Sequence, residues 1–111
     1  MAASYLEASL DRLGAPVQRD DTIEICINPD GQVWGEFQGD HFMRSLGMPL
    51  TQTEIKDLGN QIASAASTTL STKKPIVSVS ILYRDRPIRA QVIQPPAVEG
   101  GFSISLRFFS S

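Results

Sequence analysis

The chain has little of the chemistry on which enzymes and metalloproteins depend. Its 111 residues include one cysteine, Cys26, and one histidine, His41. A single cysteine cannot form an internal disulfide, and this one lies in the strand-like run TIEICIN, so we expect a small buried or half-buried thiol, in a reducing, cytosolic compartment. His41 has no cysteine or acidic cluster at ligand spacing, which argues against a metal site.

Nucleotide-binding and catalytic motifs are also missing. The sequence contains neither a G-x-x-x-x-G-K-[ST] phosphate loop nor a G-x-G-x-x-G turn. No serine lies in a nucleophile-elbow motif, so a Ser/His/Asp triad would have to be assembled arbitrarily from many serines. We therefore predict no catalytic residues in this chain.

Long apolar runs and an excess of one charge are absent as well. No run approaches the ~18 apolar residues of a membrane-spanning helix, and no signal-peptide pattern is present at the N-terminus. The formal net charge of −2 argues against a nucleic-acid binder that neutralises many phosphates. Any anion site must therefore be local.

Two segments, residues 4–14 and 51–70, have the apolar spacing of amphipathic helices. Each opens with a capping box, at Ser4 and at Thr51, in which a glutamate follows three residues later. Between the first helix and the next apolar run, residues 15–21 form a polar connection. The stripe of the longer helix consists of Ile55, Leu58, Ile62, Ala65, Ala66 and Leu70.

Alternation of apolar and polar residues predicts six strands. In the first, Ile23, Ile25 and Ile27 share one face, and an N-P-D-G turn follows. The order helix, three strands, helix, three strands predicts one α+β domain over residues 1–111, with a mainly antiparallel sheet of about six strands and helices packed on one face. The strand segments are residues 22–28, 32–39, 41–46, 76–83, 88–92 and 102–108.

The last two strands form a hairpin across the run PPAVEGG, whose prolines and glycines suit a longer loop. The register that pairs Val92 with Ile104 keeps both apolar faces together and places Arg89 directly opposite Arg107. A slip of two residues would also keep the faces together, with the two arginines diagonal to each other on the same face. Like charges about 5 Å apart at Cβ are destabilising unless an anion lies between them. The alternative is that both are ordinary solvated arginines on an exposed sheet face.

Arg84 and Arg86 add to the positive charge of these final strands. Guanidinium groups bind phosphates in a bidentate manner. The residues alone therefore support a small anion site on an α+β module that has no catalytic machinery of its own.

Several runs together resemble a known family. YLEASLDRL, TIEICINPDGQVWGE, KPIVSVSIL and RAQVIQPPAVEGGFSISLR are similar, in this order and over nearly the whole chain, to the N-terminal domain of the hexameric traffic ATPases of type IV secretion systems, the VirB-eleven family. The specific parts are the EICIN strand with its Pro/Gly turn and the R-x-Q run that leads to a closing S-I-S-L-R strand.

The resemblance implies that Arg89 and Arg107 reach the phosphates of ATP at a domain interface. It also implies that the phosphate loop, the catalytic acids and Mg²⁺ belong to a second domain outside this chain, so the isolated domain is not expected to hydrolyse ATP. The implied partners are other copies in a homo-hexamer and inner-membrane components of the conjugation or effector-translocation machinery, with no direct nucleic-acid contact. The implied location is cytoplasmic, peripheral to the inner membrane.

The chain departs from the family pattern at two places. Family members usually have a Gly-Glu pair before the first arginine, whereas Pro87 and Ile88 stand there in this sequence; Arg84 or Arg86 is an auxiliary candidate for part of that role. Family members also tend to follow the closing arginine with a basic residue and a proline, whereas Phe108 and Phe109 follow Arg107 here; we expect these two phenylalanines to be poorly covered in a complete protein.

Two other functions stay open from the sequence. The domain would serve mainly as a docking surface for secretion components if a partner still bound after both arginines were replaced. It would be a free-standing small-ligand sensor if the natural protein ended at Ser111.

Overall fold

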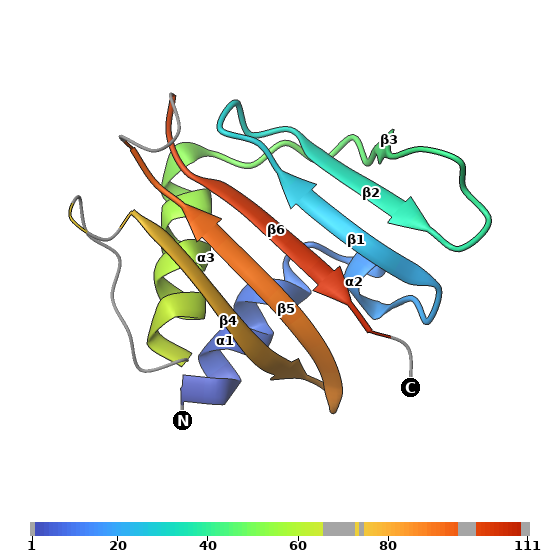
Figure 1. Ribbon diagram of the computed structural model, residues 1–111, viewed down its shortest axis with the longest axis horizontal. Coiled ribbons are helices and arrows are strands. Elements are labelled where there is room, and N and C mark those ends of the chain that lie inside the picture. Colours follow the sequence, from blue (N-terminus) through green and yellow to red (C-terminus); the bar gives the residue numbers. More distant parts are fainter. Residues whose placement is uncertain (1, 66–72, 74, 96–99, 110–111) are drawn as a thin grey trace.

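A six-stranded antiparallel sheet forms the centre of the molecule (Figure 1). The computed structural model describes residues 2–65, 73, 75–95 and 100–109. The strands are β1 (Thr22–Ile27), β2 (Val33–Phe37), β3 (Arg44–Ser45), β4 (Ile76–Tyr83), β5 (Arg86–Ile93) and β6 (Ser103–Phe108).

The strand order is β3-β2-β1-β6-β5-β4. Two meanders, one from each half of the sequence, are therefore joined where β1 pairs with β6. The predicted α+β class, antiparallel sheet and strand number are confirmed. The sequence analysis predicted the hairpin of β5 and β6 but not this central pairing.

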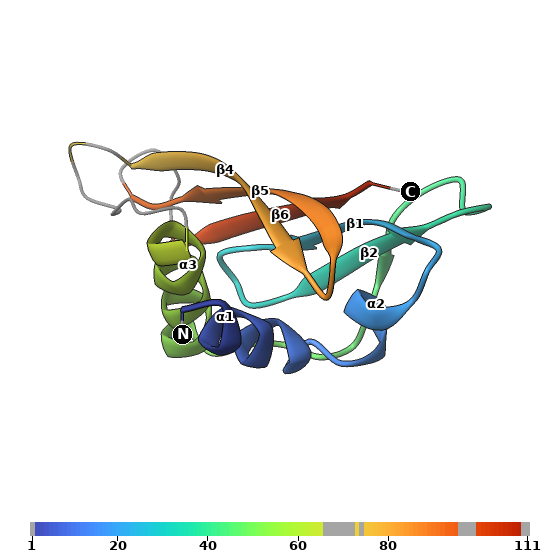
Figure 2. The same cartoon turned by 90° about the horizontal axis from the view of Figure 1, so that it is seen from below.

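The helices of the described residues lie on one face of the sheet (Figure 2), as predicted. They are α1 (Ala2–Asp11), the short α2 (Ala15–Gln18) and α3 (Gln52–Ala65). Leucines of α1 and isoleucines of α3 meet the inward side chains of the sheet in one core. None of the helices in the described ranges is long and apolar enough to cross a membrane.

The predicted start of α3 is confirmed in atomic detail. The backbone N–H of Thr51 donates to the Glu54 carboxylate (2.9 Å), and the N–H of Glu54 donates to the Thr51 hydroxyl (3.1 Å), which satisfies two amides at the helix start. The predicted helix α1 is present, but its predicted start is wrong, because the helix begins at Ala2 and Ser4 lies inside it.

Two further details of the first half differ from the prediction. The connection at residues 15–21 contains α2, because the apolar Val17 is buried in the core and Pro16 suits the first helical turn. In β1, a register shift between Thr22 and Glu24 makes Thr22 the buried residue and leaves Ile23 half-buried. The bulge thus interrupts the predicted alternation of isoleucines.

The end of the chain is better covered than predicted at one of its two phenylalanines. Phe108 is buried, whereas Phe109 is 48% exposed. Ala66 and Leu70 of the predicted helical stripe, and most of the loop between β5 and β6, lie outside the described residues.

The N-P-D-G turn after β1 gives a test of the fold. Gly31 and Gly39 both have φ of +92°, but a Cβ on Gly31 would lie 2.3 Å from the carbonyl oxygen of Leu50, whereas a Cβ on Gly39 would meet nothing within 4 Å. We expect Gly39→Ala to cost about 1–2 kcal/mol of unfolding free energy, the cost of the left-handed conformation. Gly31→Ala should cost about 3 kcal/mol or more, because overpacking adds to that strain.

Urea unfolding of the two variants measures this difference. Equal losses of stability would show that the close approach of Gly31 to Leu50 does not constrain the fold.

Candidate functional site

Arg89 and Arg107 lie directly opposite each other on β5 and β6. The same pairing aligns Ala90 with Leu106 and Val92 with Ile104, so the predicted register is confirmed. The apolar pairs face the helices and are buried, while both arginines point to the uncovered face and are exposed. Among the described residues neither guanidinium has a hydrogen bond or an ion pair.

The two arginines line a shallow depression of about 270 Å³ on the uncovered face. Its other walls are polar side chains of four strands, namely Glu24, Ser78, Gln91 and Ser105. The guanidiniums, hydroxyls and the amide can all donate hydrogen bonds, so the depression suits a small oxyanion better than an apolar ligand.

Glu24 is the acidic member of this depression. It lies on β1 directly opposite Arg107, and its Oε2 accepts hydrogen bonds from the hydroxyl of Ser105 (3.3 Å) and from the thiol of Cys26 (3.2 Å). Sequence reasoning missed Glu24. Its place on the polar face of β1 was visible in the alternation, but its neighbours come from β6, about eighty residues later in the chain.

Cys26 is half-buried, as predicted. Burial and the nearby carboxylate of Glu24 raise the pKa of its thiol to about 11. The thiol is therefore protonated at neutral pH and acts as a hydrogen-bond donor, and it is a poor nucleophile.

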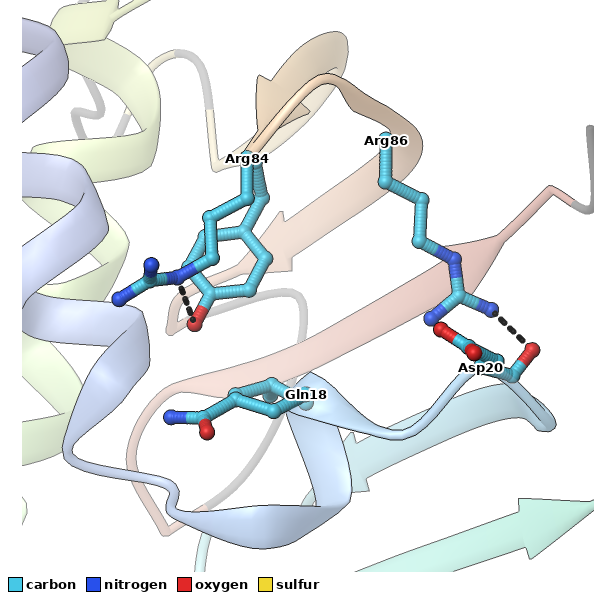
Figure 3. Close-up of a pocket in the computed structure, with 6 residues that line it drawn as sticks. Gln18, Asp20, Arg84 and Arg86 are labelled. Carbon is cyan, nitrogen blue, oxygen red and sulfur yellow. Dashed lines mark hydrogen bonds between the residues drawn. The ribbon is translucent and has the colours of Figure 1, made fainter.

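Arg84 and Arg86 lie on the other side of the sheet, around a second depression of about 270 Å³ near α2 (Figure 3). The parity of positions along the strand explains this: Arg86 shares the face of the buried Ile88, whereas Arg89 faces the opposite way. Arg84 belongs to the tight turn between β4 and β5. The structure does not bring either residue together with Arg89 and Arg107, so the expected auxiliary role does not fit this geometry.

Arg86 is held by the backbone at and just before the start of β1. Its guanidinium donates to the carbonyl oxygens of Arg19 (2.7 Å), Asp20 (3.3 Å) and Thr22 (2.8 Å), and it lies over the ring of Phe108 at 4.8 Å from the centroid. These contacts explain why Phe108 is buried.

Arg84 joins a cluster with Asp11 and Tyr83. Its guanidinium forms an ion pair with Asp11 (3.0 Å), and the buried hydroxyl of Tyr83 also donates to that carboxylate. The hydrogen bond from Tyr83, followed by Arg84, lowers the pKa of Asp11, while burial and the neighbouring Asp11 raise the pKa of Tyr83. The cluster attaches α1 to the turn between β4 and β5, which is a structural role.

The described residues contain no group of three or more histidine, cysteine or acidic side chains that could hold a metal ion. In this part of the chain the uncovered face thus offers cationic and hydroxyl donors to a ligand, without a cluster of metal-ligating side chains.

Loss of Arg86, which is bonded within the fold, should affect stability differently from loss of Arg89 or Arg107, which are not. We expect Arg86→Ala to lower the free energy of unfolding by about 2 kcal/mol or more, because it leaves carbonyl groups without their charged donor. Arg89→Ala and Arg107→Ala should change it by about 0.5 kcal/mol or less, with a slight gain from relieved repulsion. Urea unfolding without added anions tests this; a loss at Arg89 equal to that at Arg86 would make Arg89 structural.

The rate at which the Cys26 thiol is alkylated measures the effect of Glu24 on the pKa of that thiol. Glu24→Gln removes the carboxylate that favours the neutral thiol, so the pKa of Cys26 should fall and more thiolate should be present at pH 8. We expect iodoacetamide to modify Cys26 about threefold to tenfold faster in this variant. Glu36→Gln is the control, because Glu36 acts on the thiol only through a weaker charge effect; an equal acceleration there would contradict the assignment to Glu24.

Curated proteins with similar sequences are type IV secretion proteins, although no family model matches the chain. PtlH of Bordetella pertussis, and its homologs in Bordetella parapertussis and Bordetella bronchiseptica, are each 29% identical over 111 residues. The match covers 96% of this chain but 32% of each relative, so the chain spans about a third of their length.

A solved structure has the same fold over the whole chain. It is the crystal structure of the VirB11 ATPase from the Brucella suis type IV secretion system in complex with sulphate, with a TM-score of 0.79 and 22% sequence identity. The match covers 100% of this chain and 32% of that one. Sequence and fold thus confirm the predicted resemblance, and the chain is similar to the N-terminal domain of the VirB11-family ATPases of type IV secretion.

Proposed function

We propose that this chain is the nucleotide-covering and assembly domain of a type IV secretion ATPase, and that Arg89 and Arg107 bind the phosphates of ATP. The observation that carries the proposal is the direct opposition of these two exposed arginines on the uncovered face.

The energetics of this pair favour a bound anion. Like charges opposite each other on neighbouring strands repel, and an anion that lies between two arginines offsets this repulsion because it attracts both of them. Two adjacent guanidiniums present several N–H donors, which match the oxygens of a polyphosphate. Ser78, Gln91 and Ser105 border the same depression and extend it with neutral donors.

The comparisons support an oxyanion ligand in general terms. The structural neighbour is an ATPase crystallised with sulphate, an ion whose tetrahedral shape and negative charge resemble those of phosphate. That an ion of this kind would lie at Arg89 and Arg107 of this chain is part of the proposal.

The proposed role of this chain is to hold phosphates, and the hydrolytic step belongs to another domain. Arginines that contact the phosphates of a bound nucleotide stabilise the negative charge that develops as the terminal phosphoryl group is transferred. When Mg²⁺ is bound in the full-length protein, it supplies charge neutralisation at the phosphates. The depression here contributes cationic donors, and Glu24 lies opposite Arg107, where it can orient that side chain.

The wider setting follows from the same proposal. The full-length protein would form a homo-hexamer, contact inner-membrane components of the secretion system and act at the cytoplasmic side of that membrane. Sequence similarity to PtlH supports a role in type IV secretion.

Phosphate binding is tested on the 111-residue chain itself. We expect titration with ATP, and with inorganic tripolyphosphate, to shift the backbone amide NMR signals of β5 and β6. Arg89→Ala and Arg107→Ala should each weaken binding about tenfold or more, since hydrogen bonds to charged groups contribute about 1.5–3 kcal/mol. The domain alone should show no ATP hydrolysis.

Arg12→Ala is the matched control. It removes the same charge from an exposed arginine beside α1 and α3 on the helical side, so binding should change little. If Arg12→Ala weakened binding equally, the effect would come from net charge and not from a local site. ATP binding that survives loss of both Arg89 and Arg107 would refute the site.

A further inference from the structure

The sheet has two very different edges (Figure 1). At one edge, β3 has only two residues and includes the charged Arg44, features that discourage pairing with another strand. At the other edge, β4 runs for eight residues, IVSVSILY, with no charged residue and no proline. Within the part of the chain that the structure describes, β4 pairs only with β5.

The outer edge of β4 presents a regular row of backbone groups. The N–H of Gln94 donates to the carbonyl oxygen of Pro75 (2.8 Å), so the odd-numbered positions here direct their backbone groups toward β5. Because these directions alternate along an antiparallel strand, Ile76, Ser78, Ser80 and Leu82 direct their N–H and C=O groups outward. A second strand at this edge would find donors and acceptors in place.

Two large apolar side chains accompany this row. Leu82 is 63% exposed and Ile76 is 48% exposed, and both lie on the uncovered face of the sheet. They stand at opposite ends of β4, with two exposed serines between them.

We propose that β4 pairs with β4 of a second copy of this chain, antiparallel and across a two-fold axis at Val79. In this register Ile76 lies opposite Leu82 of the second copy, and Ser78 lies opposite Ser80 of the second copy. On the helical face Val77 lies opposite Ile81 of the second copy. Every outward backbone group of the row then meets a partner, and the pair of Ile76 with Leu82 occurs twice, once at each end.

Neighbouring registers lack this self-complementarity. A shift of one residue would place the core face of one copy beside the open face of the other. A shift of two residues in one direction would set Leu82 opposite a serine. A shift of two residues in the other direction would leave Leu82 beyond the start of the other strand. The antiparallel arrangement also brings the start of β4 in one copy, which Lys73 precedes, to the end of β4 in the other, which Asp85 follows, so opposite charges lie at the same end of the pairing.

A two-fold pairing of this kind closes on itself and yields a dimer with one continuous sheet. It goes beyond the proposed function, since it differs from the head-to-tail contacts that build a ring and leaves Arg89 and Arg107 on the uncovered face. Loss of phosphate binding would therefore not affect this inference.

Sedimentation velocity over a concentration series tests the dimer. The wild-type chain should pass from one to two copies per particle as concentration rises. Ile76→Lys combined with Leu82→Lys puts like charges opposite each other twice and should weaken dimerisation about tenfold or more. Ile76→Lys combined with Leu82→Glu puts opposite charges at the same places and should dimerise more tightly than the double-lysine variant.

Phe42→Lys is the control for loss of an exposed apolar side chain. Phe42 is 78% exposed and follows β2 at the far side of the sheet, so this variant should dimerise as the wild type does. The inference is overturned if the wild type stays monomeric at millimolar concentration, or if it forms open-ended aggregates. It is also overturned if the two charge variants, shown to be folded by circular dichroism, dimerise equally.

Discussion

The pairing of β1 with β6 is the interaction on which the rest of the structure depends. It joins the first meander to the second, although about eighty residues separate Ile25 and Ile27 from their partners in the register, Leu106 and Ile104. All four side chains are buried, and burial of each such side chain contributes roughly 1.5–3 kcal/mol. Without this pairing the chain would form two three-stranded sheets, each with an open inner edge and half a core.

The same pairing arranges the charges of the uncovered face. Successive cross-strand partners form a row of Glu36, Glu24, Arg107 and Arg89 across β2, β1, β6 and β5. Two acidic residues thus adjoin two basic ones, and only the central neighbours, Glu24 and Arg107, have opposite charge. The row is neutral as a whole but strongly polar along its length. An anion site at its arginine end is therefore compatible with the acidic composition of the chain, because the positive charge is local.

Local patterns predicted much of this molecule. The alternation in the last two strands limited their register to pairings that keep the apolar faces together, and the pairing that sets Arg89 opposite Arg107 is the one observed. The capping box placed the start of α3. The bulge at Thr22 was not predictable from alternation, because the competing register depends on tertiary packing. Glu24 was missed for a related reason: its partners Ser105 and Arg107 belong to β6, and no local signal specifies which distant strand becomes a neighbour.

Because side chains alternate between the two faces of a sheet, residues of the same type on one strand can have different roles. Arg86 and Arg89 are three positions apart on β5, so they point to opposite faces of the sheet. On the helical face Arg86 finds backbone carbonyls and the ring of Phe108, and its donors are used within the fold. On the uncovered face Arg89 meets Arg107, and its donors remain available to a ligand. The number of arginines in the final strands is thus a poor guide to anion binding. The face of the sheet on which each arginine lies is a better one.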